Sequence, residues 1–156
     1  MTSENLELSI THLIDAPVET VWKVATERLA EWWCPKPWAV EIIEQDWRAG
    51  GRSAMVMRGP NGEEMPHEGV FLEVSPGKRF VFTDAFATGW RPQSPFMVGT
   101  MEFADEGGKT RYIGRARHWT REAYDQHKAM GFEQGWTAVA KQLAALAEAE
   151  NKALGR

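Results

Sequence analysis

Cysteine is almost absent from the 156-residue chain, in which Cys34 is the only one. A single cysteine excludes an internal disulfide and a CxxC zinc pair, and it is typical of a reducing compartment. The longest unbroken apolar run, residues 143–147, is far shorter than the ~20 residues that a helix needs to cross a bilayer. Residues 1–5 carry neither the basic head nor the apolar core of a secretion signal. We therefore expect a cytoplasmic protein that does not associate with a membrane.

A basic excess is also missing. Eighteen Lys and Arg residues stand against 22 Asp and Glu residues, which gives a net charge of −4. This balance argues against a binding surface for nucleic acid or anionic lipid. Tyrosine is rare, with two residues, whereas there are eight tryptophans. Large, mostly apolar rings suit either an ordinary core or the wall of a ligand cavity.

No complete catalytic, metal-binding or nucleotide-binding motif is present. The segment that starts at His67 begins like an HExxH zinc motif, but Phe71 replaces the second histidine. Residues 106–110 end like a phosphate-binding loop, yet Phe103 stands where its first glycine belongs. Cys34 is better explained as a small buried hydrophobic residue than as a nucleophile. We therefore expect no metal and no cofactor, and no catalytic set is evident.

The pattern of apolar residues predicts a single α+β domain. Residues 6–14 alternate in polarity for most of their length, which predicts a first strand. Asp15 as N-cap and Pro17 in the first turn predict a helix over residues 18–25. A second short helix is expected over residues 27–33. Six further strands are expected, at residues 38–47, 52–58, 65–74, 79–86, 96–104 and 109–119.

The longest helical pattern covers residues 120–152, where one continuous helix is expected. Its apolar residues recur at helical spacing and form a stripe suited to lying across a sheet: Phe132, Trp136, Val139, Leu143 and Leu146. Gly131 and Gly135 lie beside this stripe, and each costs a helix about 1 kcal/mol relative to alanine. We expect them to allow close approach to the sheet or to leave room for a ligand. Simple tolerance near the helix start is the alternative.

Several segments, in this order along the chain, resemble the START-like (SRPBCC, helix-grip) superfamily: residues 14–22, 46–51, 69–74, 79–83 and 130–136. Within this superfamily the chain is similar to bacterial proteins homologous to activators of a heat-shock chaperone ATPase. It also resembles polyketide cyclases. The resemblance implies one α+β domain over residues 1–156. A curved antiparallel sheet of about seven strands, in the order β-α-α-β6-α, would wrap around the long C-terminal helix. The resemblance also implies an apolar cavity between sheet and helix, but this fold carries several unrelated functions.

Candidate site residues follow from this implied cavity. The expected lining residues are Trp32, Trp33, Met55, Met57, Phe82, Asp84, Met101, Tyr112, His118, Phe132 and Trp136. Trp32 and Trp33 are expected to close one end, whereas Tyr112, His118 and Asp84 supply polar groups that orient a ligand. A structural hydrogen bond or a solvated position remains the alternative for each polar group. For the methionines, plain core filling is the alternative.

The expected strand over residues 65–74 leaves the orientation of His67 open. Val70, Leu72 and Val74 have the character of an inward-facing set. That register places His67 outward, unless a bulge at Gly69 shifts it.

Binding of an apolar, aromatic or lipid-like small molecule is the function that we expect. One alternative is a cyclase or hydratase-type enzyme in which His118 or Asp84 moves protons on a bound substrate. Another is a chaperone-associated interaction module, which would need a sizeable exposed patch. The sequence leaves open which ligand is bound and whether the chain forms a homodimer.

Overall fold

A computed structural model describes residues 5–155 of the chain. Its main sheet is antiparallel and has the strand order β1-β9-β8-β5-β4-β3-β2. The seven strands are β1 (Glu7–Ile14), β2 (Ala39–Gln45), β3 (Arg52–Arg58), β4 (Glu64–Ser75), β5 (Arg79–Thr83), β8 (Met97–Glu106) and β9 (Lys109–His118). The short strands β6 (Phe86–Ala87) and β7 (Arg91–Pro92) pair separately. The helices are α1 (Val18–Glu27), the 3₁₀ turn η1 (Leu29–Glu31), α2 (Arg121–Ala129) and α3 (Phe132–Ala153).

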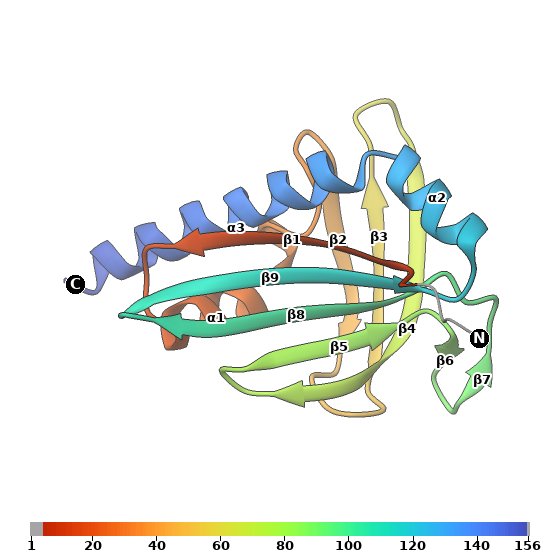
Figure 1. The fold of residues 1–156 in the computed structure, drawn as a ribbon, viewed down its shortest axis with the longest axis horizontal. Coiled ribbons are helices and arrows are strands. Elements are labelled where there is room, and N and C mark those ends of the chain that lie inside the picture. Colours follow the sequence, from red (N-terminus) through yellow and green to blue (C-terminus); the bar gives the residue numbers. More distant parts are fainter. Residues whose placement is uncertain (1–4, 156) are drawn as a thin grey trace.

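The sheet is strongly curved, because β2, β3 and β4 run steeply across the direction of β1, β8 and β9 (Figure 1). Helix α3 lies along the sheet beside β1 and also contacts α1. This arrangement confirms the expected α+β helix-grip fold.

The core forms where the apolar stripe of α3 meets the sheet. Phe132, Val139 and Leu143 are buried along one side of the helix, as their spacing predicts. Burying a leucine side chain such as Leu143 contributes about 1.5–3 kcal/mol to folding. The docking of α3 therefore rests on this stripe rather than on helix propensity.

The prediction of one continuous helix over residues 120–152 is wrong. The chain leaves α2 after Ala129 and enters α3 at Phe132. Between them Gly131 has a φ of 90°, a left-handed conformation that an L side chain rarely adopts. Gly131 therefore forms a sharp turn between two helices. The apolar spacing is helical on both sides of Gly131, so the sequence pattern did not reveal this turn.

Three other expected boundaries also differ. Asp15 does not cap α1, since Pro17 occupies the N-cap position and makes no side-chain capping bond. The expected helix over residues 27–33 is reduced to the single turn of η1. Strand β5 ends at Thr83 rather than at residue 86. The Thr83 hydroxyl donates to the Met97 carbonyl and accepts a hydrogen bond from the Ala85 N–H, which turns the chain out of the sheet.

Strand β4 contains a bulge that corrects the expected register. The pairing with β5 shifts between Phe71 and Glu73, rather than at Gly69. Phe71 faces the core, whereas Leu72 is 40% exposed, so the expected alternating inward set fails at Leu72. Val74, beyond the bulge, does pack against the core. Since side chains alternate along a strand, His67 shares the inward face with Phe71.

Candidate functional site

A cavity of about 370 Å³ lies between the sheet and the start of α3. All the expected lining residues except His118 lie along it: Trp32, Trp33, Met55, Met57, Phe82, Asp84, Met101, Tyr112, Phe132 and Trp136. Most of the lining side chains are apolar or aromatic. The fold therefore brings together residues from the η1 loop, β3, β5, β8, β9 and α3.

The loop after η1 closes one end of the cavity and is tied to α3 by one side chain. The amide nitrogen of Gln142 donates to the carbonyl oxygens of Trp32 and Cys34, at 3.2 and 2.9 Å. The amide oxygen of Gln142 accepts a hydrogen bond from the backbone N–H of Lys36, at 3.0 Å. Trp33, held in this loop, packs edge-on against Phe82. Gln142 thus holds both tryptophans of the loop in place, and the sequence pattern gave no sign of this role.

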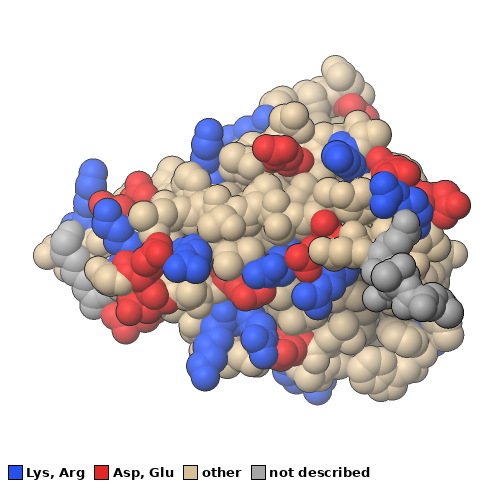
Figure 2. Space-filling view, viewed as in Figure 1, with Lys and Arg blue, Asp and Glu red and all other residues tan. Residues whose placement is uncertain are grey.

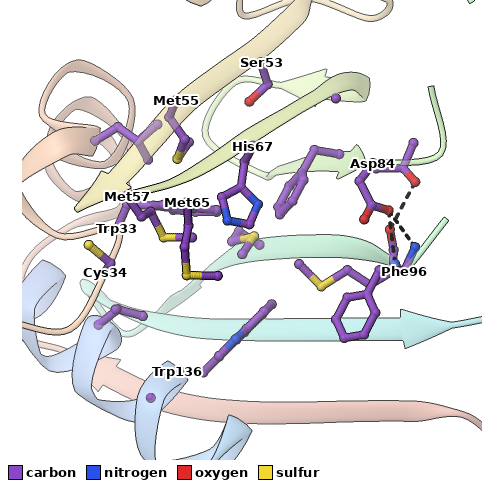
Figure 3. Close-up of a pocket in the computed structure, with 18 of the residues that line it drawn as sticks. Trp33, Cys34, Ser53, Met55, Met57, Met65, His67, Asp84, Phe96 and Trp136 are labelled. Atoms are coloured by element: carbon purple, nitrogen blue, oxygen red, sulfur yellow. Dashed lines mark hydrogen bonds between the residues drawn. The ribbon is translucent and has the colours of Figure 1, made fainter. Parts of the chain in front are cut away.

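Methionines supply much of the sheet side of the cavity. Met55 pairs with His67 across β3 and β4, and Met57 pairs with Met65. Figure 3 shows Met57, Met65 and His67 projecting from the sheet toward Trp136 on α3. Every methionine that the structure describes, namely Met55, Met57, Met65, Met97, Met101 and Met130, lines the cavity. Flexible thioethers of this kind adapt to ligands of different shape.

Glycines shape the opposite wall. A Cβ added at Gly135 would have Pro35 as its nearest neighbour, at 4.0 Å, and Gly135 lines the cavity. Gly135 was expected either to allow close approach to the sheet or to leave room beside the helix. The geometry shows room beside the helix. Close approach to the sheet occurs elsewhere, at Gly114 of β9, over which the Trp136 ring lies.

Asp84 places a carboxylate at the cavity edge. Its Oδ1 atom accepts hydrogen bonds from the backbone N–H groups of Phe96 and Met97, at 2.9 and 3.2 Å, as Figure 3 shows. These bonds anchor the carboxylate and leave Oδ2 without a partner among the described residues. His67 lines the same cavity, where the surrounding protein lowers the pKa of its imidazole and the charge of Asp84 opposes that effect.

One buried hydrogen-bond donor in the cavity wall lacks a partner within the described part of the chain, and a buried hydroxyl lies in the same wall. The hydroxyl is that of Tyr112, which is 1% exposed and lines the cavity. Burial raises the pKa of the Tyr112 hydroxyl, which keeps its proton. The amide nitrogen of Gln45 is buried and unpaired, although the amide oxygen accepts from the Ser53 hydroxyl. An unpaired buried donor costs about 1–3 kcal/mol, so the amide nitrogen of Gln45 is suited to receiving a ligand atom.

His118 lies behind the cavity wall instead of lining it. Its Nδ1 atom is 3.0 Å from the Leu6 carbonyl oxygen, and its Nε2 atom is 2.9 Å from Nδ1 of His127. His127 on α2 lines the cavity and packs against the rings of Phe96 and Phe132. His127 was not among the expected site residues, because the sequence pattern predicts one continuous helix there. Only the break at Gly131 turns α2 so that this residue reaches the cavity.

Burial and the neighbouring His118 lower the pKa of His127 to about 4. His127 is therefore neutral at neutral pH. Burial likewise raises the pKa of the Cys34 thiol, which stays protonated and serves as a small apolar group in the wall.

Other kinds of site find little support in residues 5–155. No group of three or more His, Cys, Asp or Glu side chains in that range is arranged to hold a metal ion. None of the helices described is both long and apolar enough to span a bilayer. On the face of the molecule shown in Figure 2, basic and acidic side chains are interspersed. Ion pairs between such side chains are common among the described residues, for example Arg115 with Glu102 at 2.6 Å.

A family model described as "Activator of Hsp90 ATPase homolog 1-like protein" matches residues 15–148. The chain belongs to this family. Its resemblance to the START-like superfamily is thereby confirmed, and the AHSA1-like fold agrees with the sheet and helix described above.

Solved structures share this fold. A protein from Nitrosomonas europaea is 34% identical, covers 96% of this chain and 98% of its own, and superposes with a TM-score of 0.87. A protein from Mycobacterium smegmatis is 26% identical over 91% of this chain and 90% of its own, with a TM-score of 0.76. The AHSA1 protein from Silicibacter pomeroyi, 20% identical, covers 92% and 99% with a TM-score of 0.69 and shares the fold. A search of curated proteins found no significant match.

Proposed function

We propose that the protein binds an apolar or aromatic small molecule in the cavity between the sheet and α3. The observation that carries this proposal is the cavity of about 370 Å³ lined by flexible methionines and aromatic rings, with unpaired polar atoms in its wall. Protein interiors are ordinarily close-packed and their buried polar groups are ordinarily paired. A ligand would fill the space and supply a partner for the amide nitrogen of Gln45.

The alternative of a cyclase or hydratase-type enzyme that uses His118 or Asp84 has less support than ligand binding. His118 does not line the cavity, and both its ring nitrogens already take part in hydrogen bonds. One oxygen of Asp84 is held by two backbone N–H groups. A cyclase-type mechanism needs groups that are free to exchange protons with a substrate, and these two residues do not form such a pair.

The interaction-module alternative draws on the family's name, which refers to activation of the Hsp90 ATPase. Large exposed apolar side chains exist, among them Leu13, Ile43, Trp90 and Trp119. They come from β1, β2, the loop before β7 and the segment after β9. Single exposed hydrophobic residues are normal on protein surfaces, so a cavity ligand remains the better-supported partner.

The proposal also retains a cytoplasmic location, since the one cysteine stays unpaired as it does in a reducing compartment. Neither a nucleic acid nor a membrane is a proposed partner. A homodimer is compatible with ligand binding and is tested by the mass of the protein in solution.

Ligand binding is tested by titrating a panel of apolar and aromatic compounds while tryptophan fluorescence and melting temperature are recorded. Trp33, Trp47 and Trp136 line the cavity, so an occupant should change their emission. A ligand that binds only the native state also raises the melting temperature. The variant Gly135→Leu should fill the cavity and weaken binding, whereas Ala145→Leu, on the exposed side of the same helix, should not. No response of the wild type to the whole panel would favour the interaction module.

A further inference from the structure

The backbone carbonyl of Leu6 fixes the proton positions on His118. A carbonyl oxygen only accepts hydrogen bonds, so the Nδ1 atom of His118, 3.0 Å away, must carry a proton. In neutral His118 the other nitrogen, Nε2, then has a lone pair and acts as an acceptor.

The proton position on His118 in turn fixes the proton position on His127. Its Nδ1 atom lies 2.9 Å from Nε2 of His118 and must donate to that lone pair. A neutral His127 with a proton on Nδ1 has none on Nε2. Because burial and His118 lower the pKa of His127 to about 4, this neutral form is the one present at neutral pH.

The Nε2 atom of His127 lies on the edge of the ring that faces the cavity. His127 is 8% exposed and lines the cavity, whereas His118, toward which Nδ1 points, does not. The opposite ring edge, which contains Nε2, is therefore the edge left for the cavity. Within residues 5–155, Nε2 has no hydrogen-bond partner. The rings of Phe96, Phe132 and Trp136 surround the imidazole and limit the access of water.

We propose that the cavity is selective for apolar molecules that carry a hydroxyl group, and that Nε2 of His127 accepts the hydrogen bond of that hydroxyl. This inference rests on the proposed function and names the chemistry of the ligand. An ether or carbonyl oxygen presents only lone pairs and leaves Nε2 unpaired, and a carboxylate is disfavoured for the same reason. The free Oδ2 of Asp84 is a second acceptor in the wall, and the amide nitrogen of Gln45 is an unpaired donor. A hydroxyl both donates and accepts, so it can pair with either kind of group.

His118 is a positioning residue in this scheme. It touches no ligand, but it determines which nitrogen of His127 carries the proton. The hydrogen-bond partner of one ring nitrogen commonly sets the tautomer of a histidine in this way.

The test compares two probes of similar shape, 2-naphthol and 2-methoxynaphthalene, by isothermal titration calorimetry. Wild-type protein should bind 2-naphthol at least about tenfold more tightly, since leaving a buried acceptor unpaired weakens binding. His127→Phe should abolish this preference with little change in the affinity for 2-methoxynaphthalene. Tyr124→Phe, a control on the same helix that removes a hydroxyl outside the cavity, should keep it.

Nitrogen-15 NMR of the histidine rings tests the proton positions in wild-type protein and does not depend on a variant that folds. Both His118 and His127 should carry their proton on Nδ1, and a proton on Nε2 of neutral His127 would overturn the inference. Equal affinity of the wild type for both probes, or a preference that survives in His127→Phe, would overturn the hydroxyl inference and leave cavity binding intact. Failure of both probes to bind would count against the proposed function itself.

Discussion

Trp136 of α3 lies directly over Gly114 of β9: a Cβ on Gly114 would be 3.1 Å from Cε3 of the Trp136 ring. The missing side chain lets the ring lie against the sheet while its other side faces the cavity. One glycine in a strand thus sets how closely Trp136, a wall of the cavity, approaches the sheet.

Replacing Gly114 should therefore affect both the fold and the cavity. In Gly114→Val the added methyl groups would push Trp136 away, and overpacking of this kind costs about 1–3 kcal/mol. Gly135→Ala is the matched control, because an alanine there meets only Pro35 at 4.0 Å. It should stabilise α3 by about 0.5–1 kcal/mol. Urea denaturation of the two variants checks these opposite signs, and a Gly114→Val protein as stable as the wild type would contradict the packing described.

Gln142→Leu should loosen the loop that closes the cavity. The variant loses three hydrogen bonds to the backbone of Trp32, Cys34 and Lys36. Leaving such groups unpaired costs about 1–3 kcal/mol in total stability. Hydrogen exchange at the Lys36 amide should accelerate in this variant, whereas Lys141→Leu, an exposed neighbour, should leave it unchanged. Unchanged exchange in Gln142→Leu would show that other contacts hold the loop.

Stability should fall as the pH drops from about 6.5 to about 4, through His127. Its pKa is lower in the folded protein than the ordinary value of about 6.5, so the unfolded chain binds more protons across this window. The loss at the acid end is on the order of 3 kcal/mol. The groups that face His127 are His118 and the aromatic rings of Phe96, Phe132 and Trp136.

Urea denaturation at a neutral and at an acid pH measures this effect. His67, whose pKa is also lowered, contributes in the same direction, so the comparison must be made against His127→Phe. A phenylalanine cannot titrate, and the variant should lose less stability on acidification. Parallel losses in wild type and variant would exclude His127 as the source.

The fold could be predicted from the sequence because its signals are local and repeated. The alternating strands and the stripe of Phe132, Val139 and Leu143 each report which face is buried. The break between α2 and α3 could not be predicted in this way, since Gly131 interrupts a pattern that is helical on both sides. The bulge after Phe71 was missed for a similar reason, because one extra residue reverses the orientation of every side chain on one side of it.

The apolar wall of the cavity was easier to anticipate than its polar groups. Met55 and Trp136 are large and apolar, and their positions follow from strand and helix periodicity. The hydrogen-bonding roles of His127, Gln45 and Gln142 depend on contacts between segments far apart in the sequence. No spacing rule encodes those contacts, so they emerge only from the folded structure.

Methionine-methyl NMR during a titration with 2-naphthol tests the central claim most directly, because every methionine that the structure describes lines the cavity. The methyl signals of Met55, Met57, Met97 and Met101 should shift together and saturate with one equivalent of ligand. The same titration of Gly135→Leu should show much weaker shifts. Methyl signals that stay unchanged while 2-naphthol binds elsewhere, or that respond equally in Gly135→Leu, would contradict a ligand site between the sheet and α3.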